Sequence, residues 1–465
     1  MFFCKYCPKC LLLTGVTERI FMFRRKLGNT HVPHYKNTAG LSAIPMPAPQ
    51  SVLLPVIQHI GAPATVVVKP GDTVKIGDIV AEASGYVSSP IYASVSGTVG
   101  KPERYLRADG KNVDAIRIES DGLMAKADVQ PPVINSLDDL TEAVRLSGLV
   151  GLGGAGFPTA VKLDAAKKGI IHTLVLNGAE CEPYITTDTR TMLDNGELIR
   201  ECAELLLKFI PSLEKIYIGI EKNKPECISV MTELFSDIEC AEVVSLPSLY
   251  PQGAEKVIVH NTAGIVIEEG KLPADFGVLV MNVTTAAELM KYVKTGMPLV
   301  ARTVTVDGTA VDEPKNLVVP IGTSVFDVLA AARVSEDSVG MVIFGGPMMG
   351  TSICSAGEPI TKTTGAITVL TEADAKRREA TPCIHCGRCV EACPIGLNPT
   401  AYSKALNIEI TDDRMLKLED EKVMLCMECG CCSFVCPASR PLVQNNRIAK
   451  AQLRDFRAHS ATLKN

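Results

Sequence analysis

A cysteine motif that occurs twice near the C-terminus constrains this chain more than any other feature. Both copies have the spacing CxxCxxCxxxCP; the first comprises Cys383, Cys386, Cys389 and Cys393, and the second comprises Cys426, Cys429, Cys432 and Cys436. Three thiolates at this spacing lie on one tight loop, whose backbone N–H groups can donate to the sulfurs of an iron–sulfur cluster. Structural zinc sites use paired CxxC units instead. The spacing therefore favours two [4Fe–4S] clusters over a pair of zinc sites.

The repeated motif resembles the two-cluster signature of bacterial ferredoxins, in which the fourth cysteine of each copy ligates the cluster of the other copy. The resemblance implies that one cluster, here called cluster 1, is bound by Cys383, Cys386, Cys389 and Cys436. The other, cluster 2, is then bound by Cys393, Cys426, Cys429 and Cys432. Packed or partly exposed thiols rather than ligands are expected at Cys202, Cys227, Cys240, Cys354 and Cys431.

The composition limits the classes to which the protein can belong. A chain of 465 residues should form several domains, because single cores stop growing beyond roughly 250–300 residues. A net charge of −5 without a basic run argues against a nucleic-acid-binding protein, since phosphates demand clustered Lys and Arg. The 17 cysteines indicate metal binding in a reducing compartment, because disulfides do not persist there. We therefore expect a cytoplasmic metalloprotein.

The two ends of the chain and its relation to a membrane give three further expectations. No run of 18 or more apolar residues occurs, so the sequence predicts no membrane-spanning helix, and any membrane contact is expected to go through a partner. Residues 1–25 are interpreted as an N-terminal extension, with Met22 as a candidate true start. Their three cysteines, Cys4, Cys7 and Cys10, lack the fourth ligand of a cluster site. Residues 451–465 are interpreted as a tail.

The chain is predicted to be a multidomain α+β protein with four units. Residues 26–125 contain short alternating segments and resemble the barrel-sandwich hybrid of biotinyl and lipoyl carrier domains, but the stretch from 81 to 94 lacks the lysine that would carry the prosthetic group. Residues 126–300 alternate apolar runs with helical patterns, which predicts an α/β layer with a largely parallel sheet. Residues 301–372 resemble a soluble-ligand-binding β-grasp module. Residues 373–450 form the helical two-cluster domain.

A glycine-rich loop in the α/β unit is the second candidate site. Its glycines are Gly151, Gly153, Gly154 and Gly156, and Phe157 and Lys162 follow them. Glycines allow a backbone to approach a phosphate closely, but tight turns need glycine too, so the residues alone leave both interpretations open. The order of the glycines matches neither the Rossmann fingerprint nor a P-loop.

The run from Gly148 to Lys162 resembles the FMN- and NADH-binding loop of the flavoprotein subunit of respiratory NADH:quinone oxidoreductase. The loop departs from that family at Leu152, where the respiratory subunit has arginine, and similar departures occur at Ala179 and Ala254. The resemblance implies that segments further along the chain complete the cofactor site. The implied residues are Asn177, Glu180, Glu182, Gly253, Glu255, Asn282 and Thr284.

The order of modules, from the barrel-sandwich region to the second cysteine motif, resembles the family of C subunits of the ion-translocating Rnf complex. This resemblance implies the NADH-oxidising subunit of a redox-driven translocase, which passes electrons from NADH through FMN to two [4Fe–4S] clusters. Its partners would be membrane and iron–sulfur subunits, and it would lie peripherally on the cytoplasmic face of the cell membrane. Two alternatives stay open: a soluble NADH-dependent reductase of the proline-reductase or cobalamin-reductase type, and an adaptor that carries only clusters.

Overall fold

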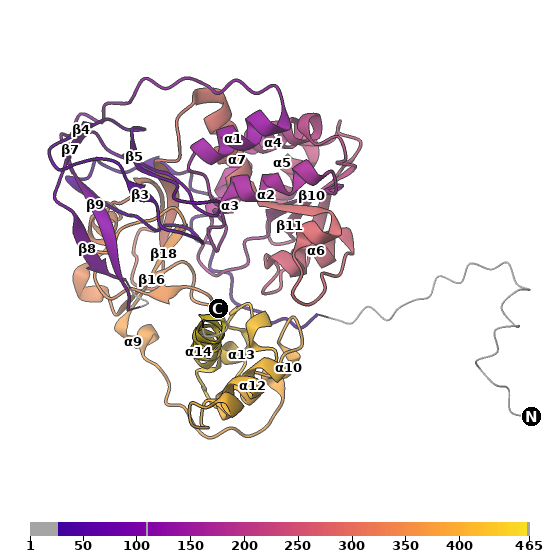
Figure 1. The fold of residues 1–465 in the computed structure, drawn as a ribbon. Helices are drawn as coiled ribbons and strands as arrows, with labels where there is room; N and C mark the ends of the chain where they lie inside the picture. The colour runs from indigo at the N-terminus through magenta and orange to yellow at the C-terminus, as the bar shows by residue number, and fades with distance from the viewer. Residues whose placement is uncertain (1–26, 108–109, 463–465) are drawn as a thin grey trace, which may run out of the picture.

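The computed structural model describes residues 27–107 and 110–462. The interpretation of residues 1–25, with their three cysteines, falls outside these ranges. The described chain forms two β-rich units, one parallel α/β layer and a small helical unit at the C-terminal end (Figure 1). The multidomain α+β class expected from the sequence is confirmed, whereas the domain boundaries near residues 125, 300 and 372 stay predictions.

The first unit is built from two small antiparallel sheets. Four strands follow the order β2-β9-β7-β4, with β8 also paired to β9, and a second sheet has the order β3-β5-β6. Val113 and Ala115 are buried on one face of the longest strand, and Ile116 and Ile118 are buried on the other, because successive side chains of a strand point to opposite faces. The strands are β2 (Ser51–Pro55), β3 (Thr65–Val66), β4 (Thr73–Val74), β5 (Ile79–Glu82), β6 (Ile91–Tyr92), β7 (Gly97–Val99), β8 (Glu103–Leu106) and β9 (Asn112–Ser120).

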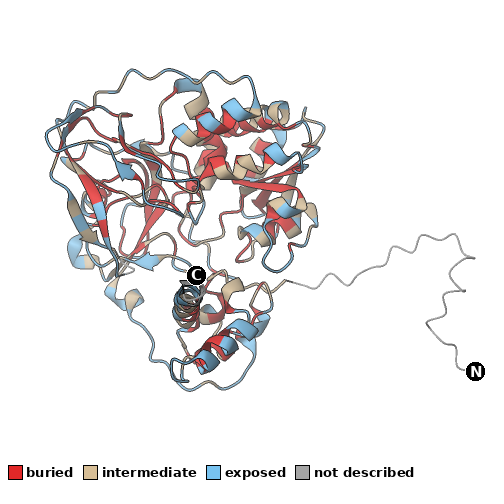
Figure 2. Cartoon of the chain, viewed as in Figure 1, coloured by how far each residue is buried: buried red, intermediate tan, exposed pale blue. Residues whose placement is uncertain are grey.

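The second unit contains a four-stranded sheet in which every pair is parallel, in the order β12-β11-β10-β13. Leu174 and Leu176 face a core shared with α4 and α7, while Val175 between them faces α6. Helices thus cover both faces of the sheet, and its strands are coloured as buried in Figure 2. Burial on both faces explains why the strands consist of continuous apolar runs. Its strands are β10 (Thr173–Gly178), β11 (Lys215–Glu221), β12 (Ala241–Leu246) and β13 (Val278–Asn282). Its helices are α1 (Leu137–Leu146), α2 (Thr159–Asp164), α3 (Thr187–Asp194), α4 (Gly196–Phe209), α5 (Pro225–Leu234), α6 (Glu255–Ala263) and α7 (Val283–Thr295).

The third unit is a mixed six-stranded sheet in the order β1-β15-β14-β18-β16-β17. Its core joins Val304 and Val306 of β14 to Val325 and Val328 of α8. The elements are β1 (Ile44–Pro45), β14 (Ala301–Asp307), β15 (Lys315–Pro320), α8 (Val325–Ala331), β16 (Met341–Phe344), β17 (Thr351–Ser352), β18 (Ala366–Leu370) and α9 (Glu372–Ala375).

The C-terminal unit is helical and lies below the other three in Figure 1. Tyr402 and Leu453 are among the side chains at the centre of its core. Its helices are α10 (Arg388–Glu391), α11 (Pro399–Ala405), α12 (Asp412–Asp420), α13 (Cys431–Phe434) and α14 (Leu442–Thr462). Within the ranges that the structure describes, no helix is both long and apolar enough to cross a bilayer.

Candidate functional site

The two copies of the cysteine motif fold into the same backbone turn. The residue before the second cysteine is left-handed in each copy, with φ 55° at His385 and 58° at Glu428. The glycine after that cysteine is left-handed too, with φ 78° at Gly387 and 81° at Gly430, and each glycine precedes a short helix. Turns of this kind direct successive N–H groups into a concavity, which suits the sulfurs of an anionic cluster. The repeated sequence therefore produces a repeated binding loop.

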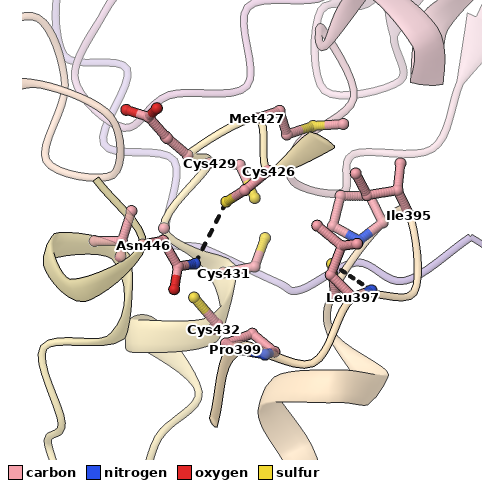
Figure 3. Close-up of a pocket in the computed structure, with 14 residues that line it drawn as sticks. Ile395, Leu397, Pro399, Cys426, Met427, Cys429, Cys431, Cys432 and Asn446 are labelled. Atoms are coloured by element: carbon pink, nitrogen blue, oxygen red, sulfur yellow. Dashed lines mark hydrogen bonds between the residues drawn. The ribbon is translucent and has the colours of Figure 1, made fainter. Parts of the chain in front are cut away.

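Two pockets in the C-terminal unit collect the cysteines in the crossed sets expected from the motif. The cluster 1 pocket is lined by Cys383, Cys386, Cys389 and Cys436. The cluster 2 pocket is lined by Cys393, Cys426, Cys429 and Cys432, together with Cys431 (Figure 3). No three His, Cys, Asp or Glu side chains of the described chain converge tightly enough to hold a single metal ion. Because four motif cysteines line each pocket, the residues present fit two clusters; the ligand assignment itself stays a prediction.

Hydrogen bonds to the cysteine sulfurs come from both the loops and α14. The backbone N–H of Leu397 donates to Cys393 Sγ at 3.3 Å, and His385 N–H donates to Cys383 Sγ at 3.5 Å. Asn446 Nδ2 of α14 lies 3.3 Å from Cys426 Sγ (Figure 3). Such donors stabilise negative charge on a bound cluster. Sequence reasoning missed Asn446, because it lies outside the motif and has no spacing signal of its own.

The cluster 2 pocket packs directly against the α/β unit. Tyr250, which is 1% exposed, donates its hydroxyl to Cys429 O at 2.7 Å. Glu182 accepts from the N–H groups of Met348 and Met349 at 3.1 and 2.7 Å. Gly430 touches this segment so closely that an added Cβ would lie 2.5 Å from Met348 O. The loop of the second cysteine motif is therefore fixed to the α/β unit and to the unit with the six-stranded sheet.

The glycine-rich loop runs across the start of α7. The two ends of the loop are joined by a hydrogen bond from Gly151 N–H to Phe157 O, which is 2.8 Å long. Leu152 N–H donates to Thr285 Oγ1 at 3.0 Å. Gly153 lies against Asn282, whose Nδ2 would be 2.7 Å from an added Cβ. Gly156 O accepts from the N–H of Ile60 in the first unit, at 3.1 Å. Two different units thus hold the loop in one conformation.

The loop offers free donors beside open space. In the described chain, the backbone N–H groups of Gly153, Gly154 and Ala155 donate to no protein acceptor, and an added Cβ at Gly154 would meet nothing within 4 Å. Arg302 of β14 donates to Leu152 O at 3.3 Å and is 3% exposed, yet its Nε and Nη1 have no partner within the described residues. A buried cation without an ion pair favours an anion nearby. These residues fit the phosphate of FMN.

Asn282 and Thr284 meet a carboxylate that the sequence did not single out. Asn282 Oδ1 accepts from the N–H groups of Thr284 and Thr285 at 3.0 and 3.2 Å, which caps α7. Its Nδ2 donates to Asp188 Oδ2 at 2.8 Å, and Thr284 Oγ1 donates to Asp188 Oδ1 at 2.6 Å. Burial raises the pKa of Asp188 above its ordinary value. Asp188 thus couples the starts of α3 and α7 beside the loop.

The remaining predicted residues gather at the carboxyl ends of the parallel strands. Asn177 at the end of β10 donates to Gly253 O at 2.9 Å. Lys162 Nζ forms an ion pair with Glu255 Oε1 at 2.7 Å and donates to Val280 O at 3.2 Å. Ligands of parallel α/β sheets bind at this edge. The structure therefore brings the loop and the residues expected around it to one place.

Glu180 and Glu182 are engaged inside the chain. The Glu180 carboxylate accepts from Asp188 N–H at 2.7 Å and from Thr189 Oγ1 at 2.8 Å, and so holds the start of α3. Burial raises the pKa of both glutamates. Lys36 Nζ donates to the carbonyls of both residues, at 2.7 and 2.8 Å. These contacts support the walls of the site, and a direct contact of either carboxylate with a cofactor stays a prediction.

Three family models match separate parts of the chain. The RnfC barrel sandwich hybrid domain matches residues 25–123, the Nuo51 FMN-binding domain matches residues 144–291, and a 4Fe-4S dicluster domain matches residues 379–446. The expected barrel-sandwich, flavin-binding and two-cluster units are thereby confirmed.

Curated relatives are similar over most of the chain. The C subunit of the proton-translocating ferredoxin:NAD(+) oxidoreductase of Clostridium ljungdahlii is 39% identical over 79% of this chain and 81% of the relative. The corresponding protein of the Na(+)-translocating oxidoreductase of Acetobacterium woodii is 40% identical over 92% of this chain and 96% of the relative. That of an ion-translocating oxidoreductase of Rhodobacter capsulatus is 37% identical over 93% of this chain and 84% of the relative.

Proposed function

Because the chain belongs to the family of C subunits of ion-translocating ferredoxin:NAD+ oxidoreductase complexes, we propose that it transfers electrons between NADH and the other subunits of such a complex. FMN and two [4Fe–4S] clusters are its cofactors, in line with the flavin-binding and dicluster matches. The observation that carries the proposal is the contact between the two sites. Residues 250–253 bond to Cys429 O at one end and to Asn177 at the other, so the cluster 2 pocket and the flavin edge of the sheet are joined by one short segment.

The residues of the flavin site would bind and orient the cofactor. The free N–H groups of residues 153–155 would hold its phosphate, and Arg302 would supply a positive charge beneath the loop. Thr285 fixes the loop to the start of α7 through Leu152 N–H, and Asn282 packs against Gly153. FMN, when bound, takes hydride from a nicotinamide and releases electrons singly, which matches a two-electron donor to one-electron clusters. The chain itself has to position NADH, FMN and the clusters, and this electron transfer needs no protein nucleophile.

The packing of the two pockets supports an order in which electrons pass through the clusters. The cluster 2 pocket touches Tyr250 and Met348 of the neighbouring units, whereas Cys386 of the cluster 1 pocket is exposed. Cluster 2 would therefore exchange electrons with the flavin, and cluster 1 with a partner. The ligand sets of the two clusters are the crossed sets predicted from the sequence.

Quantifying FMN and iron in protein prepared without oxygen tests the proposal. We expect FMN near one per chain and iron near that of two four-iron clusters, with an absorption spectrum that contains both chromophores. Iron without any affinity for FMN would support the cluster-only adaptor instead. Zinc in place of iron would contradict the proposal altogether.

The proposed place of the protein is the cytoplasmic face of the cell membrane, where other subunits hold it. In its native cells it should sediment with membranes at low salt and be released by salt or a mild chaotrope without detergent. Complete recovery in the cytosol under gentle, low-salt conditions would favour the soluble reductase alternative, which keeps the same flavin and clusters.

A further inference from the structure

The cluster 1 pocket opens to solvent through an apolar centre. Ile384, in the loop between its first two cysteines, is 67% exposed, and Val390 is 38% exposed. Both residues line the pocket, and His385 and Cys386 beside them are exposed as well. Exposed apolar side chains next to a redox site mark a surface that a partner can cover.

The rim of this opening is cationic. Lys404, which is exposed, and Arg440, which is partly exposed, line the pocket, and none of its described lining residues is acidic. The exposed run Lys376-Arg377-Arg378 adds further positive charge nearby. It ends close to Thr381, whose N–H donates to Ala438 O at 3.0 Å and whose carbonyl accepts from Arg440 at 3.4 Å.

This positive charge is local. The whole chain carries a net charge of −5, so a basic rim does not follow from the composition. Two acidic residues are adjacent in sequence to residues of this surface: Glu379 follows Arg378, and Glu391 follows Val390. Both are exposed but do not line the pocket. A cationic rim around an apolar centre suits a protein whose docking face is acidic.

We propose that the opening formed by Ile384, Val390, Lys404 and Arg440 is the docking surface for the acidic face of a protein electron carrier. This inference rests on the proposed function and names the class of partner that exchanges electrons with cluster 1. One electron crosses in each encounter: the carrier is oxidised as the cluster 1 site is reduced, or the reverse. No bond forms or breaks, and no other reactant is needed.

The docking surface is tested by measuring how tightly a small acidic two-cluster ferredoxin binds to the holoprotein. Calorimetry without NADH gives this affinity. The double variant Lys404→Glu/Arg440→Glu should weaken binding by about tenfold or more at low ionic strength, since electrostatic attraction of this kind changes association by roughly 10–10³-fold. The loss should shrink as salt screens the charges. A second variant, Lys376→Glu/Arg378→Glu, alters the rim without touching a pocket residue and should weaken binding in the same direction.

The matched control is Lys417→Glu/Arg454→Glu, which makes the same charge change at exposed positions of α12 and α14 that do not line the pocket. It should bind the ferredoxin within about twofold of the wild type. FMN and iron contents should be equal in all four proteins. The proposal would be overturned if the control lost as much affinity for the ferredoxin as the rim variants, or if neither rim variant lost affinity. Tighter binding of a basic cytochrome c than of the ferredoxin would also overturn it. A failure of NADH to reduce the protein would count against the proposed function alone, because the binding assay needs no NADH.

Discussion

Replacing Gly154 by valine should weaken flavin binding and leave the fold intact. An added Cβ at this position meets nothing within 4 Å, and Gly154 is not among the glycines with left-handed backbone. The folded chain therefore accepts the side chain without a clash. The side chain would instead fill the space in front of the free N–H groups, where we place the phosphate of FMN.

The expected loss follows from the hydrogen bonds that the valine would block. A hydrogen bond to a charged group contributes about 1.5–3 kcal/mol, and each 1.4 kcal/mol corresponds to about a tenfold change in affinity. Losing one such bond should raise the Kd of FMN by roughly 10- to 100-fold. Quenching of FMN fluorescence, titrated with flavin-free protein under anaerobic conditions, measures this Kd, and the melting temperature is recorded on the same samples.

Two control variants separate loss of the site from loss of the fold. Gly85→Val introduces the same side chain into open space in the first unit and should leave both FMN affinity and melting temperature unchanged. Gly153→Val would push against Asn282 and should lower both. If Gly154→Val bound FMN with the affinity of the wild type, the loop would not hold the phosphate, and the proposed flavin site would be wrong.

Three further predictions concern other residues. Cys393→Ser should perturb the EPR signal of cluster 2, although Cys393 belongs to the first motif; a change confined to cluster 1 would contradict crossed ligation. Arg302→Met should weaken FMN binding by about tenfold or more while Arg302→Lys retains most of it, because a hydrogen bond between charged groups contributes about 1.5–3 kcal/mol; equal losses in both variants would refute a role for the charge. Burial and the nearby Lys362 lower the pKa of His59 from 6.5 to about 4, so the unfolded chain binds this proton more readily and stability should fall as the pH drops from about 6.5 to 4. Urea unfolding at several pH values should show that the free energy of unfolding declines less steeply in His59→Gln than in the wild type. An unchanged decline would contradict the role given to His59.

The parallel sheet could be predicted from the sequence because its strands are buried on both faces. The apolar runs at residues 172–176, 215–220 and 278–283 coincide with the strands Thr173–Gly178, Lys215–Glu221 and Val278–Asn282. Buried parallel strands consist of consecutive apolar residues, which is a local signal. The cysteine motif is local in the same sense, since three of the predicted ligands of each cluster share one loop.

Contacts between distant segments could not be predicted in this way. Lys36 holds the carbonyls of Glu180 and Glu182, 144 and 146 residues away, and Arg302 reaches Leu152 from another unit. None of these pairs has a periodic or spaced pattern, because each depends on how whole units pack. The sequence also cannot distinguish a carboxylate that holds a helix start, as Glu180 does, from one that binds a ligand, since both need the same residue type in a turn.

The proposed electron path is tested by following single electrons from NADH into the clusters of one chain. Protein that contains FMN and both clusters is mixed anaerobically with NADH and frozen at intervals for EPR, while flavin absorbance is recorded in parallel. We expect the flavin to be bleached first and reduced cluster 2 to appear before reduced cluster 1, with no cluster reduction in Gly154→Val protein prepared without FMN. Reduction of the clusters by NADH in the flavin-free protein, or bleaching of the flavin without any cluster signal, would contradict that path.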